Sequence, residues 1–75
     1  MFNKEIFSLR LKELRLAKKL TLEQLGREIG VIKQTVGHWE SGIRIPSLEV
    51  AVALADYFNI SLDYLVGRTD KKERE

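Results

Sequence analysis

The stretch TLEQLGREIGVIKQTVGHWES, residues 21–41, decides the fold of this 75-residue chain. Its apolar residues recur at helical spacing, three or four positions apart, on both sides of a break at Gly30. Glycine adopts the left-handed conformation that ends a helix without steric cost. Thr21 stands directly before the first apolar residue, where a helix N-cap belongs. The pattern predicts two short helices, 22–29 and 33–41, joined by a tight turn: a helix-turn-helix.

The same stretch indicates how its two helices pack. Gly26 lies where they would cross, and a residue without a side chain lets two backbones approach closely. The other residues expected to face inward are apolar residues of the two helices and the residues of the turn. We expect the core of the motif to consist of Leu25, Gly26, Ile29, Gly30, Val31, Val36 and Trp39.

Short blocks of sequence within the motif and on both sides of it narrow the family to which it can be compared. They are RLKELR at 10–15, LT at 20–21, GV at 30–31, WESG at 39–42, PSLE at 46–49 and SLDYLVG at 61–67. In this order they resemble the DNA-binding domain of the Cro/C1 repressor family, also called the XRE family. The resemblance covers about residues 7–67. It implies an all-α fold, a compact five-helix bundle of the lambda-repressor-like DNA-binding type, with the helix-turn-helix at its second and third helices.

Further helices are expected on either side of the motif. Asn3 suits the N-cap of a first helix that ends near residue 18. Ser47 suits the start of a fourth helix over 48–58, and Ser61 caps a short fifth helix. The inward face of the fourth helix is predicted to consist of Leu48, Ala51, Leu54, Ala55 and Phe58.

Composition limits the classes of protein that fit. A hydrophobic share of 44% is that of a globular protein. We expect one domain, 1–68, followed by a charged disordered tail, 69–75. No apolar run is long enough to span a membrane, the N-terminus lacks a signal-peptide pattern, and no cysteine is present for a disulfide or a thiolate metal site. A cytoplasmic protein without a membrane partner, small-molecule substrate, metal or cofactor is expected.

The charges are distributed unevenly along the chain. Residues 1–45 hold nine Lys and Arg against five Glu, a net +4, whereas residues 46–69 hold one Arg against three acidic residues, a net −2. The basic part contains the helix-turn-helix, as a surface facing phosphates requires. A solvated face with an accidental surplus of Lys and Arg gives the same count, so the charge pattern alone leaves both interpretations open.

The outward face of the second motif helix is the expected reading surface. The resemblance implies that DNA bases are read from Lys33, Gln34, Gly37 and His38. Gln34 is the strongest candidate, because its amide offers a donor and an acceptor that match adenine N6 and N7 in the major groove. Gly37 would present no side chain to the DNA. A lone histidine such as His38 does not make a metal site.

The resemblance also implies contacts that position the reading helix. The expected phosphate contacts are Thr21, Thr35, Arg44 and Ser47. Among these, Arg44 is expected to be the main clamp. An ion pair between Arg15 and Glu40 would hold the reading helix at a fixed angle, adding orientation more surely than net stability.

Several residues depart from the family pattern. Leu22 stands where the family commonly has Gln, and Ile32 stands where it usually has Ser or Thr as a helix cap. Ile32 therefore leaves the expected reading helix without a side-chain cap, and Gly37 within it lowers its helix propensity further. Leu9 and Leu16 share one face of the first helix at positions that are usually polar, where they either cover a gap beside the fifth helix or form a protein contact.

Two functions of different classes therefore fit the sequence. The leading one is a sequence-specific regulator of transcription, a bacterial or phage repressor that binds double-stranded DNA as a homodimer. Its palindromic half-sites would lie about 34 Å apart, and the resemblance implies a dimer contact through the fifth helix and the end of the fourth. The alternative is a protein-interaction module, an adaptor or antitoxin-like protein that keeps the fold without specific DNA binding. No catalytic constellation is present, so enzyme activity is not expected.

Overall fold

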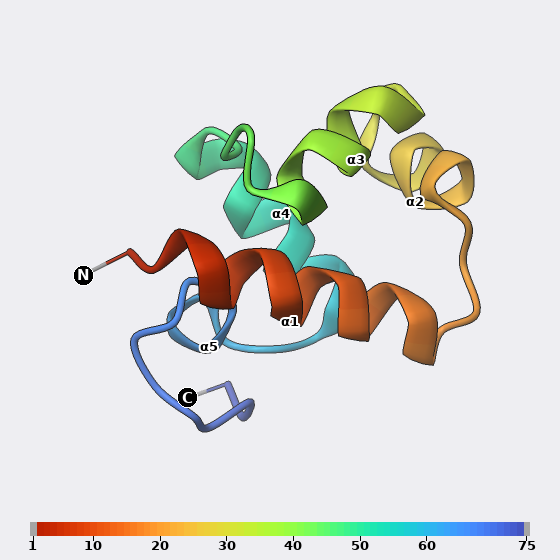
Figure 1. Cartoon of the computed structure of the whole chain (residues 1–75). Helices are drawn as coiled ribbons and strands as arrows, with labels where there is room; N and C mark the ends of the chain where they lie inside the picture. The colour runs from red at the N-terminus through yellow and green to blue at the C-terminus, as the bar shows by residue number, and fades with distance from the viewer. Residues whose placement is uncertain (1, 75) are drawn as a thin grey trace.

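The computed structural model describes residues 2–74 and consists of five helices. They are α1 (Lys4–Ala17), α2 (Leu22–Ile29), α3 (Lys33–Ser41), α4 (Leu48–Phe58) and α5 (Leu62–Leu65). In Figure 1, α2 and α3 lie above one end of α1, α4 lies above its middle, and α5 lies beneath it. The expected all-α bundle of five helices is confirmed, with the helix-turn-helix at α2 and α3. None of the described helices is long and apolar enough to cross a bilayer.

Local side-chain chemistry sets where the helices begin and end. Four helices start after a polar cap whose side chain accepts a backbone hydrogen bond: Asn3, Thr21, Ser47 and Ser61. Ile32, before α3, provides no such bond. Gly30 and Gly42 end α2 and α3 in the left-handed conformation, with φ of 96° and 79°. The lengths of the motif helices therefore follow from the sequence at their ends.

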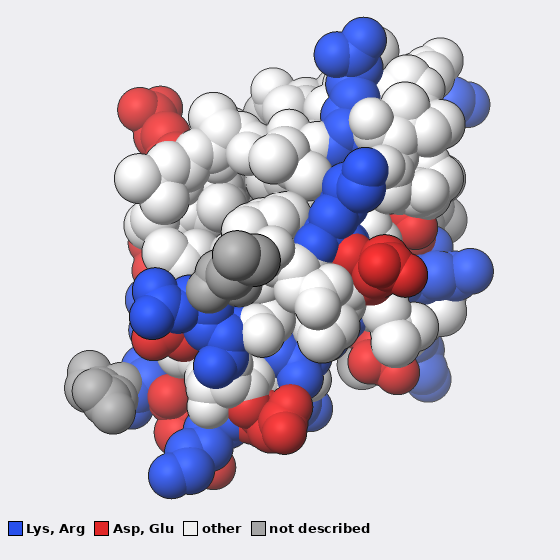
Figure 2. Space-filling view, turned by 60° about the vertical axis from the view of Figure 1, so that its left-hand side comes forward, with Lys and Arg blue, Asp and Glu red and all other residues white. Residues whose placement is uncertain are grey.

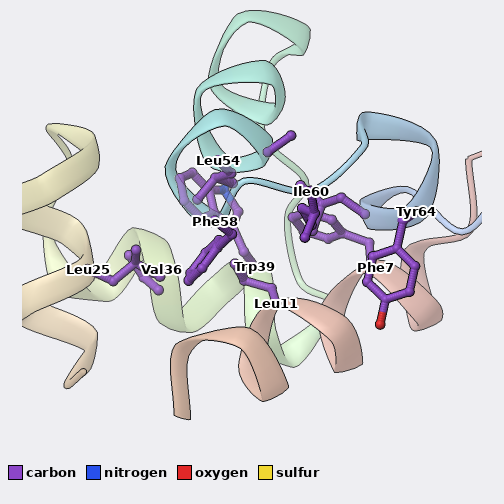
Figure 3. Packing of buried hydrophobic residues seen from close by; sticks show 11 residues of the cluster. Phe7, Leu11, Leu25, Val36, Trp39, Leu54, Phe58, Ile60 and Tyr64 are labelled. Atoms are coloured by element: carbon purple, nitrogen blue, oxygen red, sulfur yellow. The ribbon is translucent and has the colours of Figure 1, made fainter. Parts of the chain in front are cut away.

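One hydrophobic cluster joins all five helices (Figure 3). Its buried members are Phe7, Leu11, Leu25, Val36, Trp39, Leu54, Ala55, Phe58, Ile60, Tyr64 and Leu65. Trp39, only 4% exposed, belongs to this cluster together with Leu11 of α1 and Phe58 of α4. The buried hydroxyl of Ser8 donates to the Trp39 carbonyl oxygen at 2.7 Å. These contacts place α3 on α1, so the outward face of α3 has a fixed direction.

The expectation that Leu48 faces the core is wrong. Its side chain is 73% exposed, whereas Ala51, Leu54, Ala55 and Phe58 are buried as expected. Leu48 is the first residue of α4, directly after its cap, and the buried stripe starts one turn later at Ala51. Helical spacing alone predicts the face on which Leu48 lies, but not that the packed cluster ends before it.

The residues after α5 turn back over the bundle. Polar contacts hold them: among others, the Ser61 N–H donates to the Lys72 carbonyl at 2.8 Å, Arg10 Nη2 lies 2.8 Å from Asp70 Oδ1, and Arg74 pairs with Asp56. These contacts place the tail against α1, the end of α4 and the start of α5. Disorder of this tail stays a prediction.

The turn between α2 and α3 packs closely on α2 at Gly26. A Cβ atom added there would lie 2.5 Å from the carbonyl oxygen of Val31, far closer than atoms tolerate. The Gly26 carbonyl accepts bonds from the N–H groups of Gly30 and Val31, at 2.7 and 2.8 Å. The turn therefore packs directly on the α2 backbone, which leaves no room for a side chain.

We predict opposite effects of alanine at the two helical glycines of the motif. Gly26→Ala forces the Val31 carbonyl to move and lowers the free energy of unfolding by about 1–3 kcal/mol. At Gly37 the added Cβ would lie 3.8 Å from Leu22 Cδ1, an ordinary contact. Gly37→Ala therefore raises the free energy of unfolding by about 1 kcal/mol through helix propensity. Thermal and urea unfolding measure both changes, and equal effects would contradict the close crossing at Gly26.

Candidate nucleic-acid interface

The outward face of α3 carries exposed polar side chains on a rigidly held helix. Lys33, Gln34 and His38 are exposed, whereas Val36 and Trp39 on the opposite face are buried. The exposed side chains therefore lie on one side of the helix, and none of them is needed for packing. An α-helix with such a face fits the major groove of B-DNA.

Gly37 is the exception on this face, because it is half-buried against α2. A Cβ on Gly37 would lie 3.8 Å from Cδ1 of Leu22, so the leucine side chain covers the helix at this point. Leu22 is itself half-buried and packs on the edge of the core cluster. Leu22, a departure from the family pattern on α2, thus lies over Gly37 on α3.

Arg15 and Glu40 form a bidentate ion pair that joins α1 to the end of α3. Arg15 Nε lies 2.7 Å from Glu40 Oε2, and Nη2 lies 3.0 Å from Oε1. The third donor, Nη1, bonds to the Leu20 carbonyl at 2.7 Å, just before α2. The two side chains are only 11% and 8% exposed. The Arg15 guanidinium therefore connects α1 both to α3 and to the residue that precedes α2.

The geometry of this pair keeps the arginine charged. Its hydrogen bonds to Glu40 raise the pKa of Arg15 above that of free arginine, and burial opposes this with a smaller effect. Because the pKa of Arg15 is raised in the folded state, the stability that its pairing with Glu40 contributes is present at every pH below the ordinary arginine range. It is lost only above that range. Deprotonation of Arg15 therefore plays no part in the neutral range.

The start of α2 is fixed by a capping box. Thr21 Oγ1 accepts from the Gln24 N–H at 3.0 Å, and Gln24 Oε1 accepts from the Thr21 N–H at 2.8 Å. The Thr21 hydroxyl still has its own proton, which it can donate to a phosphate oxygen. The role of Gln24 was not predicted from the sequence, although Thr-x-x-Gln before an apolar run is a known signature of a capping box.

Two other expected phosphate contacts lie on the connection to α4. Arg44 is exposed, and its N–H and that of Ile43 both donate to the His38 carbonyl, at 3.3 and 3.0 Å. Ser47 is exposed and caps α4 through a 3.2 Å bond from the Val50 N–H. The loop that carries Arg44 is therefore bonded to the C-terminal part of α3. The remaining expected contact, Thr35, is half-buried on α3.

Sequence reasoning also missed Arg10. Its guanidinium lies over the Tyr64 ring, 4.0 Å from the centroid, and Nη1 donates to the Tyr64 and Thr69 carbonyls. These partners are 54 and 59 positions away in the chain, so no local pattern indicates them. Arg10 therefore serves the packing of α1 on α5 and the tail.

The described residues offer little for other chemistry at this face. Their hollows lie beside α5 and the tail, and between α1 and the end of α3. Within residues 2–74, no group of three or more His, Cys, Asp and Glu is placed to hold a metal ion. The outward face of α3 instead presents the hydrogen-bond donors and acceptors of Lys33, Gln34 and His38.

Comparison with known proteins agrees with this arrangement. A family model described as helix-turn-helix matches residues 11–65. The chain is 44% identical over 61 residues to the HTH-type transcriptional regulator YobD of Bacillus subtilis, covering 81% of this chain and 54% of YobD. The chain thus spans about half the length of the curated relatives it matches.

Solved structures share the same fold. The P22 c2 repressor, in complex with a synthetic operator, matches with a TM-score of 0.80 and 26% identity over 85% of this chain and 97% of that one. The restriction-modification controller protein C.AhdI of Aeromonas hydrophila matches with a TM-score of 0.70 and 39% identity, over 79% and 86% of the two chains. The fold is therefore that of the lambda-repressor-like domains.

We predict that restoring a cap before α3 stabilises the protein. Ile32→Thr supplies an oxygen to the free N–H groups of the first turn and raises the free energy of unfolding by about 1 kcal/mol. For a domain of this size, the melting temperature rises by about 4–8 °C. Ile43→Thr is the control, because Ile43 is as exposed as Ile32 but caps no helix. An unchanged melt for Ile32→Thr would contradict the account of the uncapped helix.

We predict a large loss of stability when only one partner of the Arg15–Glu40 pair is removed. Arg15→Met or Glu40→Gln leaves a largely buried partner unpaired and lowers the free energy of unfolding by about 3 kcal/mol. Arg15→Met/Glu40→Gln loses less than the sum of the two single changes, as a double-mutant cycle in urea would show. The exposed pair Arg27–Glu23 is the control, with a change below about 0.5 kcal/mol for Arg27→Met. Additive losses at Arg15 and Glu40 would contradict the coupling.

Proposed function

The chain belongs to the helix-turn-helix family of Cro/C1 type, and we propose that it binds double-stranded DNA sequence-specifically to regulate transcription. The observation that carries this proposal is the outward face of α3. Lys33, Gln34 and His38 are exposed there on a helix that Trp39 and the Arg15–Glu40 pair hold in place. A base-reading helix needs donors and acceptors on a face that has a defined direction, and these residues supply them.

Gln34 is the residue proposed to read a base most directly. Its amide matches adenine N6 and N7 in the major groove, and Lys33 and His38 can donate to guanine O6 and N7. Gly37 presents no side chain to the DNA, and Leu22 lies beside it as an apolar neighbour. This division predicts that the preference at one base position depends on Gln34 alone.

Phosphate contacts are proposed to set the position of α3 in the groove. Thr21 and the first turn of α2 would hold one phosphate, aided by the positive end of the helix dipole. Arg44 and Ser47 would hold phosphates on the other side of α3, and Thr35 would touch the backbone or a thymine methyl group. Such contacts fix register without carrying sequence information.

The proposed DNA site is a palindrome that two copies of the chain occupy. One domain of this size contacts only a half-site, and twofold related copies on half-sites about 34 Å apart double the sequence that is read. We propose a bacterial or phage repressor acting in the cytoplasm. The P22 c2 repressor, a structural neighbour of this chain, is itself described in complex with an operator.

Selection from a pool of random duplexes tests the proposal. We expect the wild-type protein to enrich a palindrome, and Gln34→Ala to lose about 1–3 kcal/mol of binding free energy at one base position and to relax the preference there. Arg44→Gln is the matched comparison: it weakens binding to all sequences alike and reduces the salt dependence by about one phosphate contact.

Two results would contradict the proposal. Equal losses on all sequences for Gln34→Ala would make Gln34 a backbone contact. No enrichment by the folded wild-type protein would favour an adaptor or antitoxin-like module, and the exposed Leu9 and Leu16 would then be the first surface to examine for a protein partner.

A further inference from the structure

The polar side chains on the outward face of α3 are interrupted at Gly37, which has no side chain of its own. Leu22, the first residue of α2, covers this gap: its Cδ1 would lie 3.8 Å from a Cβ atom built on Gly37. Both residues are half-buried, so neither shuts the other off from solvent completely. A leucine methyl group therefore stands beside the side chains proposed to read bases, and none of the proposed DNA contacts uses it.

Helical spacing places the gap in the middle of the proposed reading surface. Lys33 and Gln34 precede Gly37 by four and three positions, so they lie one turn earlier on the same side of α3. His38 follows Gly37 directly, and all three polar residues are exposed. The apolar group over Gly37 is therefore surrounded by donors and acceptors that approach base edges in the proposed complex.

The packing of α2 holds Leu22 in this position. Leu22 packs on the edge of the core cluster, directly after the capping box of Thr21 and Gln24 that sets the start of α2. Four residues later, on the same side of α2, Gly26 lies against the Val31 carbonyl of the turn. This side of α2 therefore faces the turn and α3. Because Leu22 is already held, it loses little side-chain freedom when a ligand covers it.

The exposure of Leu22 separates it from a purely structural leucine. Leu25, which lies one turn further along α2, is fully buried, whereas Leu22 keeps part of its surface in water. The leucine side chain neither donates nor accepts a hydrogen bond, so a phosphate gains no such bond from it. The remaining apolar surface is stabilised by contact with another apolar group.

Thymine is the base that offers such a group. Each base edge in the major groove presents hydrogen-bond donors or acceptors, and thymine adds a methyl group at C5. The upper part of Figure 2, at the height where Figure 1 places α2, α3 and α4, shows few charged side chains, whereas Lys, Arg, Asp and Glu crowd the lower part. An uncharged contact therefore meets little electrostatic competition there. A thymine methyl group that enters the gap at Gly37 reaches Leu22.

We propose that Leu22, through the gap at Gly37, reads the C5-methyl group of one thymine in the half-site. This inference rests on the proposed function and divides the reading between two helices. Gln34 on α3 recognises one base by hydrogen bonds, and Leu22 on α2 recognises another by apolar contact. Leu22 is thus a specificity-determining residue, because cytosine at this position lacks the methyl group that it contacts.

Replacing each thymine of the selected half-site by deoxyuridine, one at a time, tests this contact. The replacement removes only the methyl group and keeps every hydrogen-bonding atom of the base. We expect one thymine at which uracil weakens binding of the wild-type protein about fourfold, the factor that burying one methyl group is worth. Leu22→Gln should bind the two duplexes equally. The ratio is measured within one protein, so any change in the stability of Leu22→Gln cancels.

Four further variants serve as comparisons, and each should keep the fourfold ratio at this thymine. Leu9→Gln makes the same replacement at an exposed leucine on α1. Gln34→Ala weakens binding at its own base position, but its contact is separate from that of Leu22. Thr35→Ser removes the methyl group of the other residue proposed to approach a thymine. Ile32→Ser removes the exposed aliphatic side chain directly before α3.

The outcomes separate this inference from the proposed function. An unchanged ratio in Leu22→Gln, or equal binding of thymine and uracil by the wild-type protein at every position, would overturn the role of Leu22 and leave the base contact of Gln34 intact. Loss of the ratio in Thr35→Ser or Ile32→Ser instead would overturn it as well, as would a selected half-site without thymine. A wild-type protein that selects no duplex would contradict the proposed function itself, and the reading of thymine with it.

Discussion

The bidentate pair between Arg15 and Glu40 is the interaction on which the working geometry depends. Its guanidinium also bonds to the Leu20 carbonyl, so a single side chain connects α1, the start of α2 and the end of α3. The apolar core alone would allow α3 to roll, since aliphatic contacts are not directional. A buried charged pair has a narrow range of acceptable geometry, and it converts a packed helix into one with a defined outward face.

Helix α3 is held firmly at its C-terminal end by this ion pair, but its N-terminal end lacks a side-chain cap. Trp39 and Glu40 hold its last turn, whereas Ile32 gives its first turn no cap and Gly37 lowers its helix propensity. Leu22 compensates in part by covering Gly37 from α2. The first turn carries Lys33 and therefore lies where DNA would supply the missing contacts. Stability is thus concentrated at the anchored end of α3 and is lowest where the helix would meet its ligand.

Local sequence patterns were sufficient to predict most of the fold, but not to predict which side chains are exposed or paired at parts of the surface. The helix ends could be predicted because caps such as Thr21 and the left-handed Gly30 act within a few residues. Leu48 could not, because periodicity gives the face of a residue but not where the packed cluster ends. The contacts of Arg10 could not be predicted either, since its partners come from the far end of the chain. The resemblance supplied the Arg15–Glu40 pairing, which no local rule contains.

The most direct test of the account is to map backbone amide shifts by NMR during titration with duplex DNA. The account predicts changes concentrated at the start of α2, along α3 and in the loop around Arg44, with Lys33 and Gln34 among the largest. Added salt should reverse them, because phosphate contacts release counterions. Changes concentrated on α1 around Leu9 and Leu16, or on α5 and the tail, would contradict the assignment of α3 as the reading helix.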